Sequence, residues 1–170
     1  DWAKVYYRRA ADLGNIEAIF YLGNLYYNSQ DYHLAAQCFR KVAETGDASA
    51  QMNLGVCYEL GRGVSRDYTQ AAYWYKKAAE QNDMIATYNL GCFHYEGRGV
   101  NQDYTEAVRY FRKAAEQGYH KAQYNLGVCY YYGRGVKADM YEAKYWIRKA
   151  ALQDHPEAVE MARDLNIPLN

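Results

Sequence analysis

The sequence predicts an all-α fold in which antiparallel helix pairs stack into a solenoid. The Leu-Gly dipeptides at Leu22, Leu54, Leu90 and Leu126 are spaced by 32, 36 and 36 residues, and a period of this length is typical of stacked repeat arrays. The segment "GRGV" recurs three times at the 36-residue period. The two prolines, Pro156 and Pro168, leave a long central region without helix breakers. Because one helix pair cannot bury both of its faces, each pair must be stabilised by its neighbours.

The residues around each Leu-Gly pair predict the first helix of the repeat, helix A. In "ASAQMNLGVCYEL" the apolar and small residues are spaced by three and four, which places them on one helical face. The segment "IATYNLGCFHYE" has the same spacing. The residues on this face are Ala50, Leu54, Cys57 and Tyr58 in one repeat and Ala86, Leu90, Phe93 and His94 in the next.

The second half of each repeat predicts helix B. "AAYWYKKAAEQN", "AVRYFRKAAEQG" and "AKYWIRKAALQD" align without gaps, and "KVYYRRAADLG" near the amino end matches the same half-unit. Small residues on one helix should let the large side chains of the next approach closely. The apolar face of helix B contains Ala71, Tyr75 and Ala78 in one repeat and Ala107, Phe111 and Ala114 in the next.

The segment "GRGV" is interpreted as the turn between helix A and helix B. Its first glycine should end helix A in a left-handed conformation, and its second should permit the chain to turn back. The valine should seal the loop onto the core. A phosphate-binding loop would require a preceding strand, and none is predicted. The turn does not explain the arginines, which we expect to be solvated near helix A carbonyls, with an anion-binding row as the alternative: Arg62, Arg98 and Arg134.

A carboxylate follows each "GRGV" loop at the predicted start of helix B. Each aspartate comes four residues after the second glycine, and a Glu or Gln comes three residues later. This is the spacing of a capping box. The pairs are Asp67 with Gln70, Asp103 with Glu106, and Asp139 with Glu142.

The repeats divide the chain into units within one repeat domain, residues 1–170. The chain opens inside a repeat, and "HPEAVEMARDLNIPLN" reads as a capping helix with Pro156 in its first turn. The expected units are a second helix of a partial or shortened repeat at 1–17, a short repeat without "GRGV" at 18–49, full repeats at 50–85, 86–121 and 122–157, and a carboxyl-terminal capping helix with its tail at 158–170.

Composition excludes several classes of function. Lys and Arg together number 20, as do Asp and Glu, so no global field attracts nucleic acid or an anionic membrane. No run of about 18 apolar residues is present, which predicts a soluble chain. No CxxC or HExxH motif occurs, and Cys92 and His94 would point to different sides of a helix, so no metal site is expected. We expect no catalytic residues and no cofactor.

The unit pattern resembles the Sel-like repeat (SLR) family, which is related to tetratricopeptide repeats. The pattern is matched residue by residue from Ala50 to Lys121, and the resemblance covers nearly the whole chain. It implies a right-handed α/α superhelix whose A helices line a concave groove. The unit at 18–49 departs from it, because that unit has the spacing of an ordinary tetratricopeptide hairpin and should have a tighter loop. SLR proteins act as adaptors, so the resemblance implies protein partners.

Cysteine usage bears on the compartment. Cys57 and Cys129 occupy one repeat position two repeats apart, too far for a disulfide in a regular array. Cysteine-rich secreted SLR proteins bridge helix B to the next helix A, but this chain has mainly Ala at the matching positions. Reduced thiols are therefore expected for Cys38 and Cys92 as well. They favour the cytoplasm, whereas the resemblance also allows a periplasmic or secreted protein.

The predicted partner-binding residues lie on the concave face of helix A. Tyrosine offers a large, rigid contact area with a polar end, which suits peptide binding, and the asparagines could bind a ligand backbone. Packing between repeats is the alternative for both types of residue. The set, called the A-helix set below, is Phe20, Asn24, Tyr27, Met52, Asn53, Val56, Glu59, Tyr88, Asn89, Cys92, Tyr95, Tyr124, Asn125, Val128 and Tyr131.

The sequence therefore predicts a non-catalytic scaffold that binds a peptide or a partner helix. A structural spacer, with partners at its ends or convex face, and a module that binds an anionic ligand through the three loop arginines are the alternatives. No nucleic-acid partner and no direct membrane insertion are expected.

Overall fold

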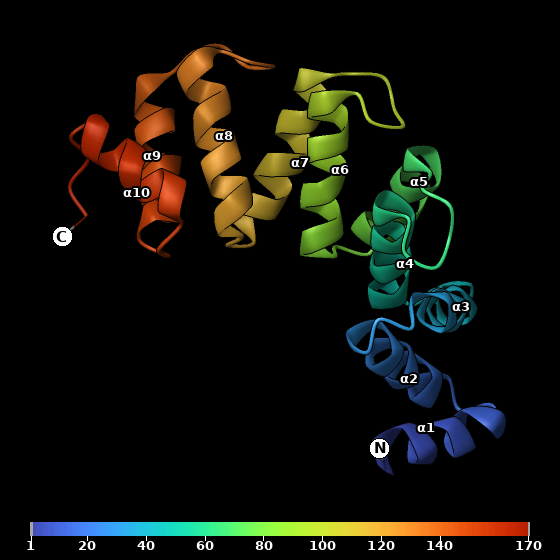
Figure 1. Ribbon diagram of the computed structural model, residues 1–170. Helices are drawn as coiled ribbons and strands as arrows, with labels where there is room; N and C mark the ends of the chain where they lie inside the picture. Colours follow the sequence, from blue (N-terminus) through green and yellow to red (C-terminus); the bar gives the residue numbers. More distant parts are fainter. Residues whose placement is uncertain (1, 170) are drawn as a thin grey trace. The chain divides into compact units, whose positions relative to one another are not determined.

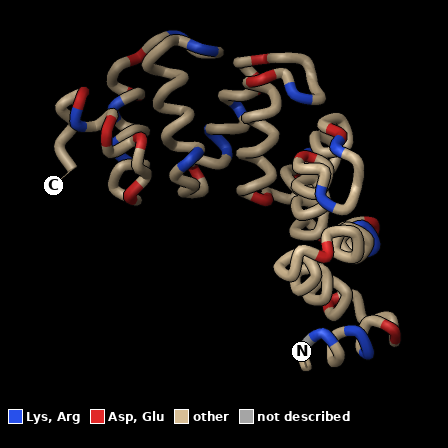
Figure 2. Tube along the Cα trace, in the orientation of Figure 1, with Lys and Arg blue, Asp and Glu red and all other residues tan. Residues whose placement is uncertain are grey.

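A computed structural model describes residues 2–169, which form helices and loops and contain no strand (Figure 1). The all-α prediction is confirmed over this part of the chain. The chain divides into two compact units, 1–83 and 84–170, and each is described by itself. Basic and acidic residues are interspersed along both units (Figure 2).

The helices of each unit follow one another along the chain, and consecutive helices within a unit pack together. Unit 1 contains α1 (Trp2–Asp12), α2 (Ile16–Asn28), α3 (Tyr32–Ala43), α4 (Ala48–Leu60) and α5 (Tyr68–Glu80). Unit 2 contains α6 (Met84–Glu96), α7 (Tyr104–Glu116), α8 (His120–Tyr132), α9 (Met140–Ala151) and α10 (Pro156–Asp164). Helices α2, α4, α6 and α8 are A helices, and α3, α5, α7 and α9 are the B helices that follow them.

The Leu-Gly pair allows helix A and helix B to approach closely. A Cβ atom added at Gly55 would lie 2.6 Å from the ring of Tyr75, which is fully buried. Any side chain at this position would displace the ring, so glycine is required by packing rather than by backbone conformation. The same relation holds between Gly23 and Phe39, Gly91 and Phe111, and Gly127 and Ile147.

The predicted apolar faces form the cores of the units. Leu54 and Cys57 of α4 are fully buried in a cluster with Phe39 of α3. In unit 2, Leu126 and Phe111 are buried in an equivalent cluster. The spacing of three and four in the sequence therefore identified both helices of the repeat correctly.

The "GRGV" loops have the predicted backbone conformation. Gly61 and Gly133 end their helices in the left-handed region, with φ of 67° for both, and the second glycines also have positive φ. Val64 and Val136 are half-buried and pack against the cores of their units. The loops are therefore turns, as predicted.

The capping-box prediction is half correct. The carboxylate of Asp103 accepts hydrogen bonds from the backbone N–H groups of Thr105 and Glu106. The reciprocal bond does not form, because the N–H of Asp103 donates to the carbonyl of His94 at 2.8 Å. Glu106 instead binds Arg109. The loop brings Asp103 back beside the end of helix A. The carbonyl of His94 in that helix therefore accepts the hydrogen bond that was expected to go to the Glu106 side chain.

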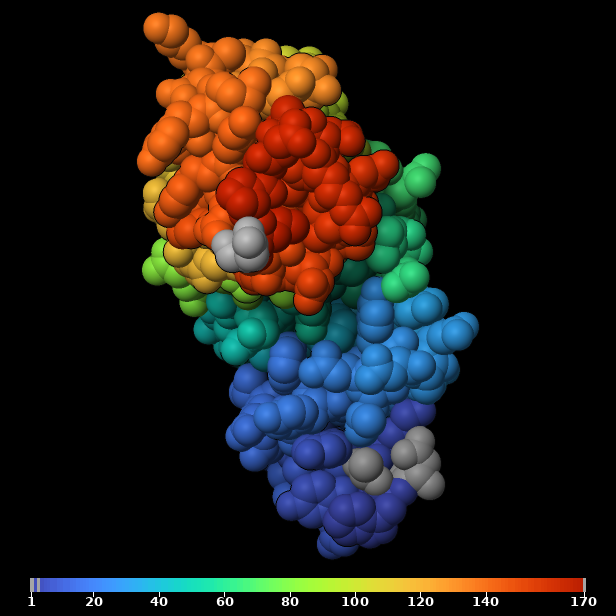
Figure 3. All heavy atoms as spheres, turned by 90° about the vertical axis from the view of Figure 1, so that its left-hand side faces the viewer, coloured from blue at the N-terminus to red at the C-terminus, as the bar shows by residue number. Residues whose placement is uncertain are grey.

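Helix A begins two residues before the predicted unit boundaries, at Ile16, Ala48, Met84 and His120. Each of these predicted units begins at the first buried alanine of helix A, whereas the helix starts with two residues before that alanine that are not buried. The short repeat has the expected tight connection of three residues, 29–31, with Gln30 at φ 65°. At the other end, α10 starts with Pro156 in its first turn, as predicted. Helix α10 lies against α9 at the end of unit 2 (Figure 3).

Candidate partner-binding site

Each unit has a pocket on the face formed by its A helices. In unit 1 it is called the α2–α4 pocket, has a volume of about 180 Å³ and is lined by Asn24, Tyr27, Phe39, Met52, Asn53 and Val56. In unit 2 it is called the α6–α8 pocket, has a volume of about 230 Å³ and is lined by Cys92, Tyr95, Glu96, Phe111, Asn125 and Val128.

The two pockets are built from the same repeat positions. In each, one A helix supplies a tyrosine, the following A helix supplies an asparagine and a valine, and the intervening B helix supplies a phenylalanine. The positions correspond in register with the Leu-Gly pairs, so Tyr27 matches Tyr95 and Val56 matches Val128. The repeat architecture therefore produces this pocket once in each unit.

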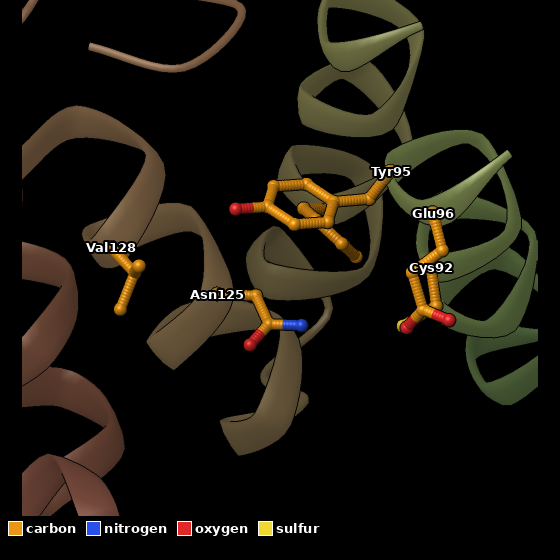
Figure 4. Close-up of a pocket in the computed structure, with 6 residues that line it drawn as sticks. Cys92, Tyr95, Glu96, Asn125 and Val128 are labelled. Carbon is orange, nitrogen blue, oxygen red and sulfur yellow. The ribbon is translucent and has the colours of Figure 1, made fainter. Parts of the chain in front are cut away.

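Aromatic packing shapes the α6–α8 pocket. Tyr95 reaches from α6 towards α8, which carries Asn125 and Val128 (Figure 4). The ring of Tyr95 lies 6.2 Å from Phe111 and 5.0 Å, edge to face, from Tyr104. Phe111 is 1% exposed, so the core itself closes one side of the pocket.

The α2–α4 pocket has the same arrangement of rings, and its polar lining residues are Asn24 and Asn53. The ring centroid of Tyr27 lies 6.2 Å from that of Phe39, which is 1% exposed. Asn53 donates its amide to the Oδ1 atom of Asn24 at 3.3 Å. This hydrogen bond joins α2 to α4, so the two asparagines connect neighbouring repeats.

All fifteen residues of the A-helix set are half-buried. The pockets contain nine of them: Asn24, Tyr27, Met52, Asn53, Val56, Cys92, Tyr95, Asn125 and Val128. The other six line neither of these pockets: Phe20, Glu59, Tyr88, Asn89, Tyr124 and Tyr131.

Most of the residues outside the pockets pack against neighbouring side chains. Tyr88 lies between the rings of Phe111 and Tyr119, and burial raises the pKa of its hydroxyl. The amide of Asn125 donates to the Tyr88 hydroxyl at 3.4 Å. Glu59 accepts a hydrogen bond from the hydroxyl of Tyr75 at 2.5 Å. These contacts agree with the packing alternative for Tyr88 and Glu59.

Three lining residues were missed by sequence reasoning. Phe111 was assigned to the apolar face of helix B, and Phe39 was not assigned; both are buried, and their rings also border the pockets. Glu96 lies at the end of α6 and forms an ion pair with Arg98, at 2.6 Å. The alternation of A and B helices could have indicated that the two phenylalanines line the pockets, because the B helix lies between two successive A helices and closes the gap between them.

The loop arginines contact tyrosines of the preceding repeat, which the sequence did not predict. Arg62 donates a hydrogen bond to the hydroxyl of Tyr27, and Arg134 donates one to that of Tyr95. Arg62 also lies 5.0 Å from the ring centroid of Tyr32. The hydrogen bond to Tyr27 raises the pKa of Arg62, so the guanidinium stays charged. Arg134 is exposed and Arg62 is half-buried, so these side chains remain in contact with solvent, but each binds a tyrosine hydroxyl where a helix A carbonyl was expected.

The second glycine of the loop explains how the arginine reaches that tyrosine. A Cβ atom added at Gly63 would lie 2.0 Å from the backbone oxygen of Tyr32, and one added at Gly135 would lie 2.1 Å from that of Tyr104. The loop backbone thus rests directly on the first turn of the preceding helix B. Only glycine permits this approach, which brings the adjacent arginine to the edge of the pocket.

The cysteines are free thiols in the part of the chain that the structure describes, as expected. Burial raises the pKa of Cys57 and of Cys129 to about 11, so both thiols are protonated at neutral pH and are poor nucleophiles. Among residues 2–169 no group of three or more His, Cys, Asp or Glu side chains is arranged to hold a metal ion. None of the described helices is both long enough and apolar enough to cross a bilayer.

Comparison with known proteins supports the repeat assignment. The Sel1 repeat model matches residues 3–15, 48–83, 85–119 and 120–155, and a tetratricopeptide repeat model matches residues 17–45. The second match falls on the short repeat without "GRGV", in agreement with its tetratricopeptide spacing. No curated protein matches the chain.

Several solved structures are similar to this chain. A protective antigen of uropathogenic Escherichia coli with an SLR fold is 36% identical, with a TM-score of 0.89 over 98% of this chain and 38% of its own. A Sel1 repeat protein from Oxalobacter formigenes is 36% identical, with a TM-score of 0.83 over 91% of this chain and 65% of its own. Cysteine rich protein B of Helicobacter pylori is 31% identical, with a TM-score of 0.54 over 69% of this chain and 86% of its own.

This chain thus spans 38% of the length of the E. coli protein and 65% of that of the O. formigenes protein. The similarity to SLR structures confirms the predicted solenoid fold class. Because the Sel1 model matches well over half of its residues, the chain belongs to the Sel1 repeat family.

Proposed function

We propose that this chain is a non-catalytic scaffold for protein–protein interaction, and that each unit binds a segment of a partner protein on the face of its A helices. The observation that carries the proposal is the recurrence of one pocket at the same repeat positions in both units. Sel1 and tetratricopeptide-like repeats typically serve as interaction scaffolds, which agrees with this role.

The size of the pockets favours a peptide side chain as the occupant. Their volumes of about 180 and 230 Å³ fall below the roughly 300–1,000 Å³ of pockets that enclose small molecules. A single large side chain of a bound segment fills a space of this size better than a cofactor does. The pockets are lined mainly by apolar and aromatic groups, which suits an apolar side chain.

The chemistry of the lining supports the same occupant. The tyrosines are fixed by ring contacts, so binding costs little additional side-chain entropy. Each pocket also contains an asparagine, Asn53 or Asn125, whose amide can exchange its weak internal bond for a bond to a peptide backbone. Phe39 and Phe111 provide an apolar surface that belongs to the rigid core.

The spacer alternative is favoured by one observation. The amides of Asn53 and Asn125 bond to side chains of the neighbouring A helix, which would stabilise the stacking of repeats without a ligand. A spacer does not require an open pocket, whereas a scaffold does. Filling the pocket therefore distinguishes the two functions.

The test uses pocket-filling variants. In Val56→Phe/Val128→Phe the added rings occupy both pockets, and Val5→Phe is the matched control because Val5 is 69% exposed on α1. Each protein is used to capture partners from an extract of the source cell, after circular dichroism has shown that all three are folded. We expect a partner retained by the parent and the control and lost by the filled variant. Equal retention by all three would favour a spacer with partners bound elsewhere.

A further inference from the structure

Two of the loop arginines lie at the pockets without a carboxylate partner. Arg62 donates to the hydroxyl of Tyr27 and Arg134 to that of Tyr95, and these tyrosines line the α2–α4 and α6–α8 pockets respectively. Within the described part of the chain, neither guanidinium forms an ion pair. Each pocket therefore has a cation held beside its tyrosine.

The third loop arginine is different. Arg98 forms an ion pair with Glu96 at 2.6 Å, so its charge is already neutralised. On the surface of α7, Arg109 is likewise paired with Glu106, at 2.8 Å. An unneutralised guanidinium at a pocket is thus a property of Arg62 and Arg134 and is not shared by all the loop arginines.

The two guanidinium groups are also held in place. Arg62 lies 5.3 Å from the ring centroid of Tyr27 and 5.0 Å from that of Tyr32, and Arg134 lies 5.2 Å from that of Tyr132. A guanidinium has five N–H donors, and the tyrosine hydroxyl uses one of them. The remaining donors can bind an anion, and the fixed position lowers the entropic cost of doing so.

The charges around the pockets leave a local excess of positive charge. Among the described residues, none with an acidic or basic side chain lines the α2–α4 pocket, and Arg62 is a cation held at its edge. The α6–α8 pocket includes Glu96, but the ion pair with Arg98 compensates that carboxylate. Both pockets therefore combine an apolar interior with an unneutralised cation at the tyrosine.

We infer that the partner segment carries an apolar side chain that enters the pocket and an aspartate or glutamate close to it in sequence that binds Arg62 or Arg134. This inference rests on the proposed function and specifies its partner: an acidic, apolar peptide segment of another protein. A hydrogen bond between a guanidinium and a carboxylate is stronger than one between neutral groups. The ion pair between the arginine and the carboxylate would therefore favour acidic segments among the segments whose apolar side chain can fill the pocket.

The test is a selection from a phage library of random dodecapeptides. The parent chain is compared with Arg62→Gln/Arg134→Gln and with a control of equal charge, Arg9→Gln/Arg163→Gln, which changes two exposed arginines. We expect the parent and the control to enrich peptides with a large apolar residue near Asp or Glu. The Arg62→Gln/Arg134→Gln variant should keep the apolar preference and lose the acidic one.

Synthetic peptides give the quantitative result. For a selected peptide, replacing its acidic residue with the corresponding amide should weaken binding to the parent by about tenfold or more, and binding to Arg62→Gln/Arg134→Gln by less than about twofold. If that variant does not fold, Arg62→Lys/Arg134→Lys replaces it, because it keeps the charge but loses the planar fork. This lysine variant should retain the acidic preference in weakened form.

The outcomes separate the two proposals. Enrichment of apolar peptides without Asp or Glu would overturn the inference and leave the proposed function standing, as would equal acidic preference in the parent and Arg62→Gln/Arg134→Gln. Absence of any enriched peptide with the parent would contradict the proposed function, and the inference with it.

Discussion

The backbone oxygen of Tyr104 occupies the position that a side chain at Gly135 would need: a Cβ atom added there would lie 2.1 Å from it. Gly135 also has a φ of 71°. The loop between α8 and α9 can therefore rest on α7 only with glycine at this position. The contact joins one repeat to the one before it and holds Arg134 next to Tyr95.

The first prediction compares the two glycines of this loop. Gly135→Ala should lower the free energy of unfolding by roughly 3 kcal/mol or more, because the methyl group would overlap backbone atoms that cannot move away cheaply. Gly133→Ala should cost only about 1 kcal/mol, since its new methyl group would lie 3.3 Å from the Cβ and backbone N atoms of Ala138 and the main penalty is the left-handed conformation. Urea unfolding of the two variants measures the difference, and equal losses would contradict the close contact.

The second prediction concerns the cap of α7. Asp103→Ala should destabilise the protein by about 1 kcal/mol, because the side chain accepts hydrogen bonds from the N–H groups of Thr105 and Glu106. Glu106→Gln serves as the control and should change stability by no more than about 0.5 kcal/mol, since Glu106 forms only an exposed ion pair with Arg109. Thermal unfolding followed by circular dichroism tests both. A large loss in the control would mean that the Glu106 carboxylate contributes more to stability than an exposed ion pair does.

The third prediction concerns the buried thiols at alkaline pH. Burial raises the pKa of Cys57 and Cys129 from 9.0 to about 11. Between these values an unfolded chain releases the thiol proton and the folded chain keeps it, so stability should be complete below pH 9 and fall as the pH rises to about 11. The loss is on the order of 2 kcal/mol for each thiol.

The measurement is the slope of unfolding free energy against pH between 9 and 11. In Cys129→Ala this slope should be smaller than in the parent, even though the variant is less stable at every pH because of the cavity. Lysines and tyrosines also titrate in this range, and the comparison of slopes cancels their contribution. Identical slopes in the two proteins would show that Cys129 is not shielded from water.

The fourth prediction concerns a histidine pair at α10. The Nδ1 atoms of His120 and His155 lie 2.9 Å apart, so at least one ring must be neutral. Burial lowers the pKa of His155 below its ordinary value of 6.5, and the charges of His120 and Lys121 act in the same direction, whereas Glu157 opposes them. The ring of Tyr124 also packs against His155.

Because the pKa of His155 is lowered in the folded state, the corresponding stability is present above about pH 6.5 and is lost as the pH falls below that value. Acidification should therefore loosen α10, whose first turn follows His155. Amide hydrogen exchange of α10 between pH 7 and pH 5, corrected for the intrinsic rate, measures this effect. His120→Gln should reduce the dependence on pH, and an unchanged dependence would exclude the pair as its source.

Local pattern was sufficient to predict the helices and their turns. The positions of Leu54, Tyr75 and Phe111 follow from spacings of three and four residues, and each is buried as expected. The left-handed cap at Gly133 and the cap at Asp139 depend on residues within one turn of the chain. Such interactions are encoded over a few neighbouring residues, so the sequence alone was enough to predict them.

The lining of the pockets was predictable only in part. The repeat register identified Tyr95, Asn125 and Val128 as residues of one face, because equivalent positions in a repeat array share an environment. The same register also selected Tyr88 and Glu59, which bond to neighbouring side chains. Periodicity specifies the face of a helix but not whether a side chain there meets a pocket or another ring.

By itself, therefore, the sequence determined the repeat family, the helix pairs, the turn chemistry and the face on which a partner is expected to bind. Only the tertiary structure decided that Gly135 contacts Tyr104, that Arg134 binds Tyr95, and that Phe111 closes a pocket between two A helices. The physical reason is distance along the chain. These pairs are brought together by the stacking of one repeat on another, and no local spacing specifies how closely two repeats approach.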